Sequence, residues 1–318
     1  MNSFRKRCAE YRGWKKGYYQ LVSDGWQEGK LFRRNEQFVY GMATVGLMHL
    51  KFNLGIHAFT LMPNHIHIVL SGTGSDCVDG FDYFRRRTST RLVRDGDPTL
   101  PADYGFKLIP INDEQEMRNH FLYALRNPYE KQWCTPMGYP WGSGWGVFSM
   151  LAPLIKGEKA KDLPVRKVRS LVGANIVIPD EWEFHPTLGL LPGSFVDTRL
   201  VRKLFPSVKD FVTQMVKDYE TYVRLARELE EEVSFSQEEL LDIVKVLSKQ
   251  HFQGKGLPQL LAEEKYALAA RLHQDFNIAP GVIAQTLSLP EKIVWQVLRS
   301  KEYGPRPGFR PLPPSRIH

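Results

Sequence analysis

Two histidines separated by one residue, His65 and His67, are the pair of side chains best suited to chemistry. They stand in the segment NHIHIVL. Side chains alternate between the two faces of a β-strand, so a strand here places both imidazoles on one face and Ile66 and Ile68 on the other. Two neighbouring imidazoles can bind a divalent metal ion. A pair of solvated surface histidines is the alternative interpretation.

A tyrosine and an asparagine four residues apart form the second candidate group. Tyr123 and Asn127 fall in a segment with helical periodicity, 113–132, and on a helix they share one face. Pro128 disfavours the helical conformation at Asn127, which predicts a bend or an end of the helix there. The carbonyl oxygen of Asn127 could then turn toward a metal. A plain helix terminus with a polar residue explains the same spacing.

The segments around these residues predict alternating strands and helices. Strands are expected at 17–23, 55–61, 65–70 and 106–111, and helices at 35–52, 79–94 and 113–132. Pro63-Asn64 predicts a hairpin turn between the second and third strands. This order predicts an α+β fold, a ferredoxin-like four-stranded antiparallel sheet with helices on one face. The other face would then be open to a ligand.

The whole chain is expected to divide into four parts. Residues 1–150 form the α/β domain, and residues 151–235 a mostly helical accessory region. Residues 236–303 form a helical domain in which 278–300 (IAPGVIAQTLSLPEKIVWQVLRS) resembles a helix-turn-helix unit. Residues 304–318 are a mobile tail rich in Pro and Arg.

Composition limits the class of protein. The chain has 318 residues and a formal net charge of +8, which favours a polyanionic partner such as nucleic acid. Three widely spaced cysteines exclude a disulfide framework and a cysteine-based zinc site. No apolar stretch is long enough for a membrane helix, and the polar, basic start is unlike a secretory signal. A cytoplasmic, nucleoid-associated protein without a membrane partner is expected.

Basic residues gather in three places that could contact DNA. An arginine-rich helix at 79–94 suits phosphates, and a basic amino-terminal segment interleaved with aromatic residues suits single-stranded DNA. The last predicted helix, 290–301, would enter a major groove if the helix-turn-helix interpretation holds. Solvated helix faces and a passive helical bundle are the alternatives. The predicted DNA contacts are Arg85, Arg86, Arg87, Arg91, Lys15, Lys16, Lys292, Gln296 and Arg299.

Three motifs in this order resemble a known family. The segment MPNHIHIVL (62–70), the helix with Tyr123 and Asn127-Pro128, and the segment YPWGSGW (139–145) resemble the REP-associated tyrosine transposases. These are relatives of the single-tyrosine HUH transposases of simple insertion sequences. The resemblance covers about residues 15–150. A weaker likeness continues through PGSFVDTRLVRKLF (192–205).

The resemblance implies a role for each motif residue. His65 and His67 match the metal-binding histidine pair, Asn127 the third metal ligand, and Tyr123 the nucleophile. Tyr129 is the alternative nucleophile. The implied activity is that of a metal-dependent DNA endonuclease and strand transferase on single-stranded or hairpin DNA. It would use Mg²⁺ or Mn²⁺ and form a 5′-phosphotyrosine.

A protein that kept this fold as a catalytically silent DNA-binding regulator is the alternative function. A metal-dependent hydrolase with no DNA role is a third class, but no carboxylate near the histidine pair offers a general base. The sequence leaves the choice between a monomer and a homodimer open.

Overall fold

The computed structural model describes residues 3–26, 29–130, 138–149, 154–217, 223–226, 235, 237–252, 255–276 and 278–300. These residues belong to two compact units, Met1–Val212 and Thr213–His318. The predicted tail at 304–318 and the side chain of Tyr129 lie outside the description. Among the described helices, none combines the length and the apolar character needed to cross a bilayer.

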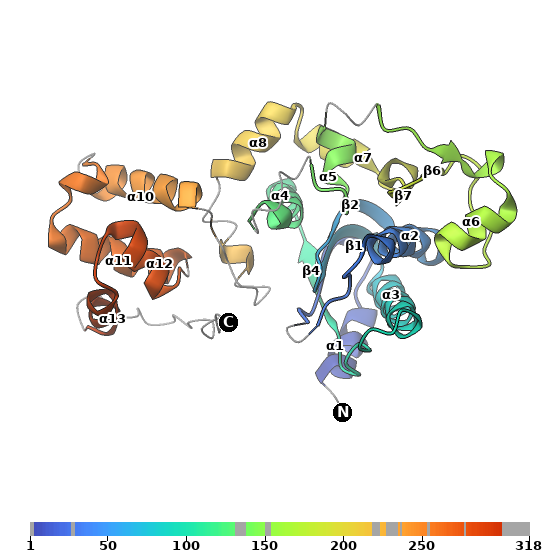
Figure 1. The fold of residues 1–318 in the computed structure, drawn as a ribbon, viewed down its shortest axis with the longest axis horizontal. Helices are drawn as coiled ribbons and strands as arrows, with labels where there is room; N and C mark the ends of the chain where they lie inside the picture. The colour runs from blue at the N-terminus through green and yellow to red at the C-terminus, as the bar shows by residue number, and fades with distance from the viewer. Residues whose placement is uncertain are drawn as a thin grey trace. The chain divides into compact units, whose positions relative to one another are not determined.

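A four-stranded sheet forms the centre of the first unit. Its strands are β1 (Gly17–Ser23), β2 (Gly55–Leu61), β3 (Ile66–Gly72) and β4 (Phe106–Ile111). They lie in the order β2-β3-β1-β4, and every neighbouring pair is antiparallel (Figure 1). The structure therefore confirms the prediction of an α+β fold around a four-stranded antiparallel sheet.

Two helices cover one face of this sheet. Helix α2 (Asn35–Phe52) connects β1 to β2, and α3 (Gly74–Arg94) connects β3 to β4. The Thr73 hydroxyl accepts a hydrogen bond from the Asp76 amide, and the Asp76 carboxylate accepts one from the Thr73 amide, so a capping box starts α3. Both helices pack against apolar side chains of the strands. Those buried strand residues are Leu21, Ile56, Phe59, Leu61, Ile66, Ile68 and Leu70.

The second face of the sheet is covered as well, which differs from the prediction of a face left open to a ligand. Helix α4 (Glu114–Glu130) packs against β2, β3 and β4, on the side away from α2 and α3 (Figure 1). The alternating pattern of β3 shows why the prediction failed. Val69 shares its face with His67 and is as fully buried as Ile68 on the other face. A strand that is apolar on both faces needs a covering layer on each.

The motif YPWGSGW runs along the free edge of β2. The Leu61 amide donates to the Trp141 carbonyl oxygen at 2.8 Å, and the Ser143 amide donates to that of Phe59 at 2.9 Å. A Cβ atom on Gly142 would lie 2.9 Å from the Phe59 carbonyl oxygen, so only glycine fits this close approach. These hydrogen bonds fix residues 139–145 to the sheet that carries His65 and His67.

Short elements make up the rest of the first unit. The helices are α1 (Ser3–Arg12), α5 (Gly144–Phe148), η2 (Ala160–Asp162), α6 (Val165–Val172), η3 (Pro192–Ser194), α7 (Thr198–Leu204) and α8 (Val208–Lys217), the last of which extends beyond Val212. A small sheet contains β5 (Glu158–Lys159), β6 (Glu183–His185) and β7 (Gly189–Leu190). Residues 154–212 therefore belong with the four-stranded sheet, whereas the sequence favoured a separate, mostly helical region from 151 to 235.

The second unit is helical in its described residues. Its helices are α10 (Gln237–His251), η4 (Leu257–Gln259), α11 (Ala262–Phe276), α12 (Pro280–Leu287) and α13 (Glu291–Arg299). Helices α11, α12 and α13 pack against one another around Leu272, Ile283, Leu287 and Val294. Ser288, with φ of 53°, ends α12 and starts a three-residue turn into α13.

Candidate active site

The two histidines of the NHIHIVL segment lie where the β2–β3 hairpin enters β3. The Met62 amide donates to the His65 carbonyl oxygen at 2.9 Å and closes the turn. His65 precedes the first residue of β3, and His67 is its second residue. Their ring centroids are 4.8 Å apart in an edge-to-face arrangement. Both imidazoles are buried on the face that α4 covers.

Helix α4 brings Tyr123 and Asn127 to the same place. The rings of His67 and Tyr123 have centroids 5.4 Å apart, and His65 Nε2 lies 3.4 Å from Asn127 Oδ1. The helix continues through Pro128 to Glu130, so it does not end at Asn127. Asn127 Nδ2 instead donates to the Tyr123 carbonyl oxygen at 3.2 Å, which aims the amide oxygen at His65.

The hydrogen bonds around His65 place two electron-pair donors face to face. His65 Nδ1 lies 2.8 Å from Asn64 Oδ1, so the proton on Nδ1 donates to that oxygen. In the neutral imidazole Nε2 then carries a lone pair, and it faces the lone pairs of Asn127 Oδ1. A cation shared by Nε2 and Oδ1 would satisfy this contact.

Burial sets the charge of His67. Loss of hydration lowers the pKa of His67 to about 3, although a hydrogen bond with Asn127 acts in the opposite direction. The imidazole is therefore neutral at neutral pH, the form that binds metals. Among the described residues no group of three or more His, Cys, Asp and Glu side chains could hold a metal ion. A metal here would depend on the amide oxygen of Asn127.

The four site residues form a closed cluster. Tyr123 exposes only 1% of its surface, and His65, His67 and Asn127 are also buried. A DNA strand can therefore reach the tyrosyl hydroxyl only after part of the surrounding chain moves.

Several polar residues beside the cluster were missed by the sequence interpretation. Asn64 orients His65, and His120, one turn before Tyr123 on α4, contacts the Gln20 side chain on β1. Arg126 is almost completely buried on the same helix. His120 and Arg126 are each three residues from Tyr123. Residues three apart lie on neighbouring parts of a helix surface, so this spacing could have identified both as neighbours of the candidate site.

The predicted arginine surface on α3 is largely committed to contacts within the chain. Arg87 donates to the carbonyl oxygens of Val172 and Gly173 and so joins α3 to the end of α6. Arg85 donates to the carbonyl oxygen of Ala102. Arg86 pairs with Asp82, yet 71% of its side chain stays exposed, so it is the most accessible of the four.

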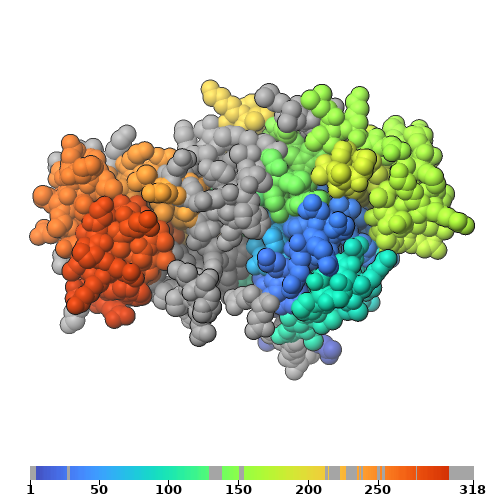
Figure 2. Space-filling model, in the orientation of Figure 1, coloured from blue at the N-terminus to red at the C-terminus, as the bar shows by residue number. Residues whose placement is uncertain are grey.

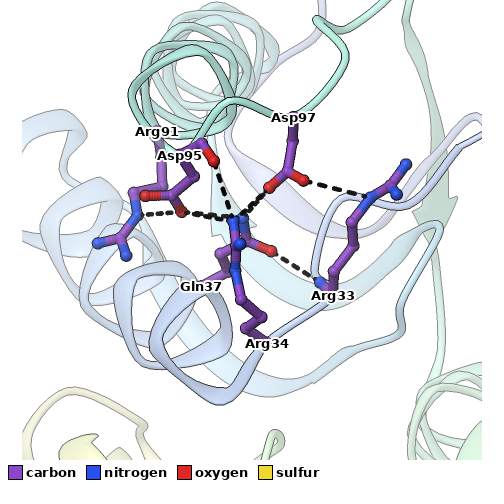
Figure 3. Close-up of polar contacts among 6 residues, drawn as sticks. All are labelled: Arg33, Arg34, Gln37, Arg91, Asp95 and Asp97. Atoms are coloured by element: carbon purple, nitrogen blue, oxygen red, sulfur yellow. Dashed lines mark hydrogen bonds and ion pairs between the residues drawn. The ribbon is translucent and has the colours of Figure 1, made fainter.

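Arg91 belongs to a polar network at the rim of the α2–α3 layer (Figure 3). It donates to Asp95 at 2.7 Å, and Gln37 donates to both Asp95 and Asp97. Arg33 and Arg34, just before α2, also pair with Asp97. The network ties the segment after α3 to the start of α2, which is a structural role for Arg91.

The amino-terminal segment is a helix packed on the sheet layer. Lys15 and Lys16 follow α1 and are exposed, as a DNA contact requires. Most of the aromatic rings around them are not available to stack on bases, because Tyr11 and Tyr19 are buried and Trp14 packs between them.

The predicted contacts of the second unit all lie on the exposed side of α13. Lys292, Gln296 and Arg299 are solvent-exposed. Trp295 joins them with 42% of its surface exposed, and the Arg299 guanidinium lies 5.1 Å from the centre of its ring. The apolar side of the helix, with Val294 and Leu298, packs into the three-helix core.

Comparisons with known proteins give one distant likeness. No protein-family model matches the chain, and no curated protein matches it. A solved structure described as "Structure of the REP associates tyrosine transposase bound to a REP hairpin" is similar to 42% of this chain and 79% of that chain, with 16% sequence identity and a TM-score of 0.34. That score is too low to support an argument, so the assignment of function depends on the geometry of the site.

Proposed function

We propose that the chain is a metal-dependent, single-tyrosine DNA endonuclease and strand transferase, similar to a transposase, that acts on single-stranded or hairpin DNA. One observation carries this proposal. Residues from the β2–β3 hairpin and from α4, which are far apart in the sequence, place two imidazoles, an amide oxygen and a tyrosine in one cluster. The sheet would be of the ferredoxin-like type, and its α4 face would be the catalytic face.

The donor set fits a divalent cation. Two ligand atoms that each lie about 2.1 Å from one ion are separated by about 3.0–3.4 Å at octahedral or tetrahedral angles. The distance of 3.4 Å between His65 Nε2 and Asn127 Oδ1 agrees with this spacing. His67 would be the third ligand. Mixed nitrogen and oxygen donors suit Mn²⁺ well and Mg²⁺ acceptably. Bound there, the ion would act as a Lewis acid on a phosphate oxygen.

Tyr123 would supply the nucleophile. Its oxygen attacks the scissile phosphorus, the bond to the 3′ oxygen breaks, and the downstream fragment stays attached through its 5′-phosphate. The tyrosyl hydroxyl loses its proton as it attacks, and the leaving 3′ oxygen takes one up, so no net proton is released or consumed. Attack on the phosphotyrosine by another 3′-hydroxyl reverses these steps and joins new strands. The phosphodiester energy is conserved in the protein–DNA bond, so the reaction needs no nucleotide cofactor.

Binding of DNA would use exposed cations from both units. Lys15, Lys16 and Arg86 are the candidates in the first unit, and Arg85, Arg87 and Arg91 would contribute less because they already hold contacts within the chain. In the second unit, α12 and α13 would form the helix-turn-helix. Lys292, Gln296 and Arg299 would then face the DNA.

The second candidate function is a DNA-binding regulator that keeps the fold without cleaving DNA. The almost complete burial of Tyr123 favours it, because a nucleophile must meet its substrate. It predicts DNA binding with no covalent product under any metal condition.

A denaturing-gel assay tests the proposal. Hairpin-forming single strands from DNA flanking the gene are labelled at the 3′ end and incubated with Mn²⁺, Mg²⁺ or EDTA. We expect a labelled protein–DNA band with metal, and its loss in Tyr123→Phe by at least about a thousandfold, as for removal of a nucleophile. Tyr18→Phe, on the same sheet, is the matched control and should keep the band. Tyr129→Phe tests the alternative nucleophile.

A band that survives in Tyr123→Phe but not in Tyr129→Phe would transfer the role to Tyr129. Tight, salt-sensitive binding of several hairpins without any band would instead establish the regulator.

A further inference from the structure

An open groove lies on the outer side of the α2–α3 layer, away from the histidine cluster. Its volume is about 480 Å³. Figure 2 shows the surfaces of α2, in blue, and α3, in teal, side by side on the visible face. The groove combines three cations with three aromatic rings: Lys51, Arg86, Arg87, Tyr40, Phe52 and Tyr83. None of the residues that line it is Asp or Glu.

The cations of this groove differ in how strongly they are held. Arg87 lies 4.4 Å from the centre of the Tyr40 ring and is fixed by the carbonyl oxygens after α6, so it shapes the wall. Lys51 rests on the Tyr83 ring at 4.5 Å and near the Phe52 ring at 5.9 Å. Within the described part of the chain, no carboxylate pairs with Lys51. An exposed cation–π contact is weak, so Lys51 can turn toward an anion at small cost.

This combination matches the chemistry of one nucleotide in a single strand. Single-stranded nucleic acid binds where bases stack on aromatic side chains and cations neutralise the backbone. When Lys51 turns to a phosphate, it leaves the Tyr83 ring open to a base, while the Arg87 guanidinium stays 5.5 Å from the ring centre. Arg86 stands on the same side of α3 with most of its side chain in solvent. An acidic peptide would use the cations but would leave the rings without a stacking partner.

The position of the groove defines which nucleotide it could take. The helices α2 and α3 and then the sheet separate it from Tyr123, which lies on the α4 face. One nucleotide cannot span both places, because a helix layer packed on a sheet is about 10 Å thick. A strand in the groove would therefore be a flanking segment, which continues around the edge of the unit before it reaches the nucleophile.

We propose that this groove is a second DNA subsite that binds one nucleotide of the single-stranded segment beside the cleavage site, with its base on Tyr83 and its phosphate against Lys51 and Arg86. This inference rests on the proposed function but concerns a surface that does not contain the catalytic cluster. It makes the groove a determinant of DNA affinity and not of the chemical step.

Binding of a fluorescent deoxythymidine dodecamer to the full chain tests the subsite. Tyr83→Leu is expected to weaken binding about tenfold, the size typical of losing one stacked base. Lys51→Ala, which removes a phosphate contact, is expected to weaken binding as well. Lys51→Ala should also reduce the salt slope by about 0.7, the value for one phosphate contact on a single strand. Tyr83→Phe keeps the ring and should bind like the wild type. Arg166→Ala removes an exposed cation on α6, outside the groove, and is the matched control.

The outcomes separate this inference from the proposed function. With hairpin DNA, an increase in KM without a change in kcat in Lys51→Ala and Tyr83→Leu supports the subsite. A decrease in kcat at saturating DNA overturns its assignment to binding.

If both variants bind the dodecamer with wild-type affinity and have unchanged melting temperatures, the subsite is also overturned, and the catalytic proposal stays intact. If the wild type binds no dodecamer even at low salt, the subsite is excluded, and the hairpin cleavage assay alone decides the function. Equal displacement of the dodecamer by a polyglutamate peptide would show a nonselective anionic surface and would overturn the base contact.

Discussion

The two faces of the four-stranded sheet are both buried, yet they are built from different kinds of residue. Toward α2 and α3 the strands present Leu21, Phe59 and Ile68, all fully buried and all apolar. Toward α4 they present the polar Gln20 and His67 beside the apolar Val69, and all three are equally buried. A buried polar group costs free energy unless it is hydrogen-bonded. The α2–α3 face therefore stabilises the fold through apolar contacts, while the buried polar residues of the α4 face depend on hydrogen bonds, between Gln20 and His120 and between His67 and Asn127.

The largest effect should come from the apolar face. Phe81 on α3 is fully buried and packs against Phe106 on β4, with ring centroids 4.4 Å apart. Phe81→Ala should lower the free energy of unfolding by about 3–5 kcal/mol, through lost burial and the cavity left behind. Urea unfolding followed by circular dichroism measures this. The control is Val93→Ala, an exposed position on the same helix, and a loss below about 1 kcal/mol in Phe81→Ala would contradict the packing described.

An apolar substitution on the α4 face should behave differently. His67→Phe replaces a buried neutral imidazole with a ring of similar shape, so the metal-free protein should change in stability by less than about 1.5 kcal/mol. The wild type should gain melting temperature when Mn²⁺ is added, because a ligand that binds only the folded state stabilises it. The variant should lose that gain. His185→Phe, outside the cluster, is the control and should keep it.

If His67→Phe costs as much stability as Phe81→Ala, the two faces do not differ in the way proposed. If Mn²⁺ raises the melting temperature of His67→Phe as much as that of the wild type, the metal does not bind at this histidine pair.

Local patterns in the sequence were enough to predict the layer that holds the fold together. The expected strands at 17–23, 55–61 and 106–111 and the helix at 35–52 have the same limits in the structure, because alternation and helical periodicity act over neighbouring residues. Helix α3 begins at Gly74, five residues earlier than expected. The capping box of Thr73 and Asp76 sets this start.

The layer around the candidate site depended on contacts that are distant in the sequence. The position of α4 follows from which strand faces are buried, and the sequence does not show that Val69 needs a second covering layer. Helix α4 continues past Pro128, although proline disfavours the helical conformation of the residue before it. Strands as short as β5 and β7 contain too few residues to show the alternation of side chains that identifies a strand. Spacing in the sequence indicated two pairs, His65 with His67 and Tyr123 with Asn127. The family resemblance joined them into one site, and in the structure the two pairs lie in contact. Their catalytic roles remain a prediction.

The smallest predicted effect concerns the polar network at the rim of the α2–α3 layer. Burial alone would raise the pKa of Asp95, but hydrogen bonds from Arg91 and Gln37 and the charge of Arg34 lower it below the ordinary value of 3.8 (Figure 3). A carboxylate whose pKa is lower in the folded state stabilises the protein fully above its unfolded pKa. That contribution disappears as the pH falls through the folded pKa.

The free energy of unfolding of the wild type should therefore decrease below about pH 4, the unfolded pKa of an aspartate. In Asp95→Asn the decrease should be shallower, because one titrating group is gone. Urea titrations between neutral pH and acid measure the two slopes, with the exposed Asp103→Asn as the control. Identical slopes in wild type and Asp95→Asn would show that the rim network contributes nothing to stability, and the α2–α3 layer would then be held by its apolar contacts alone.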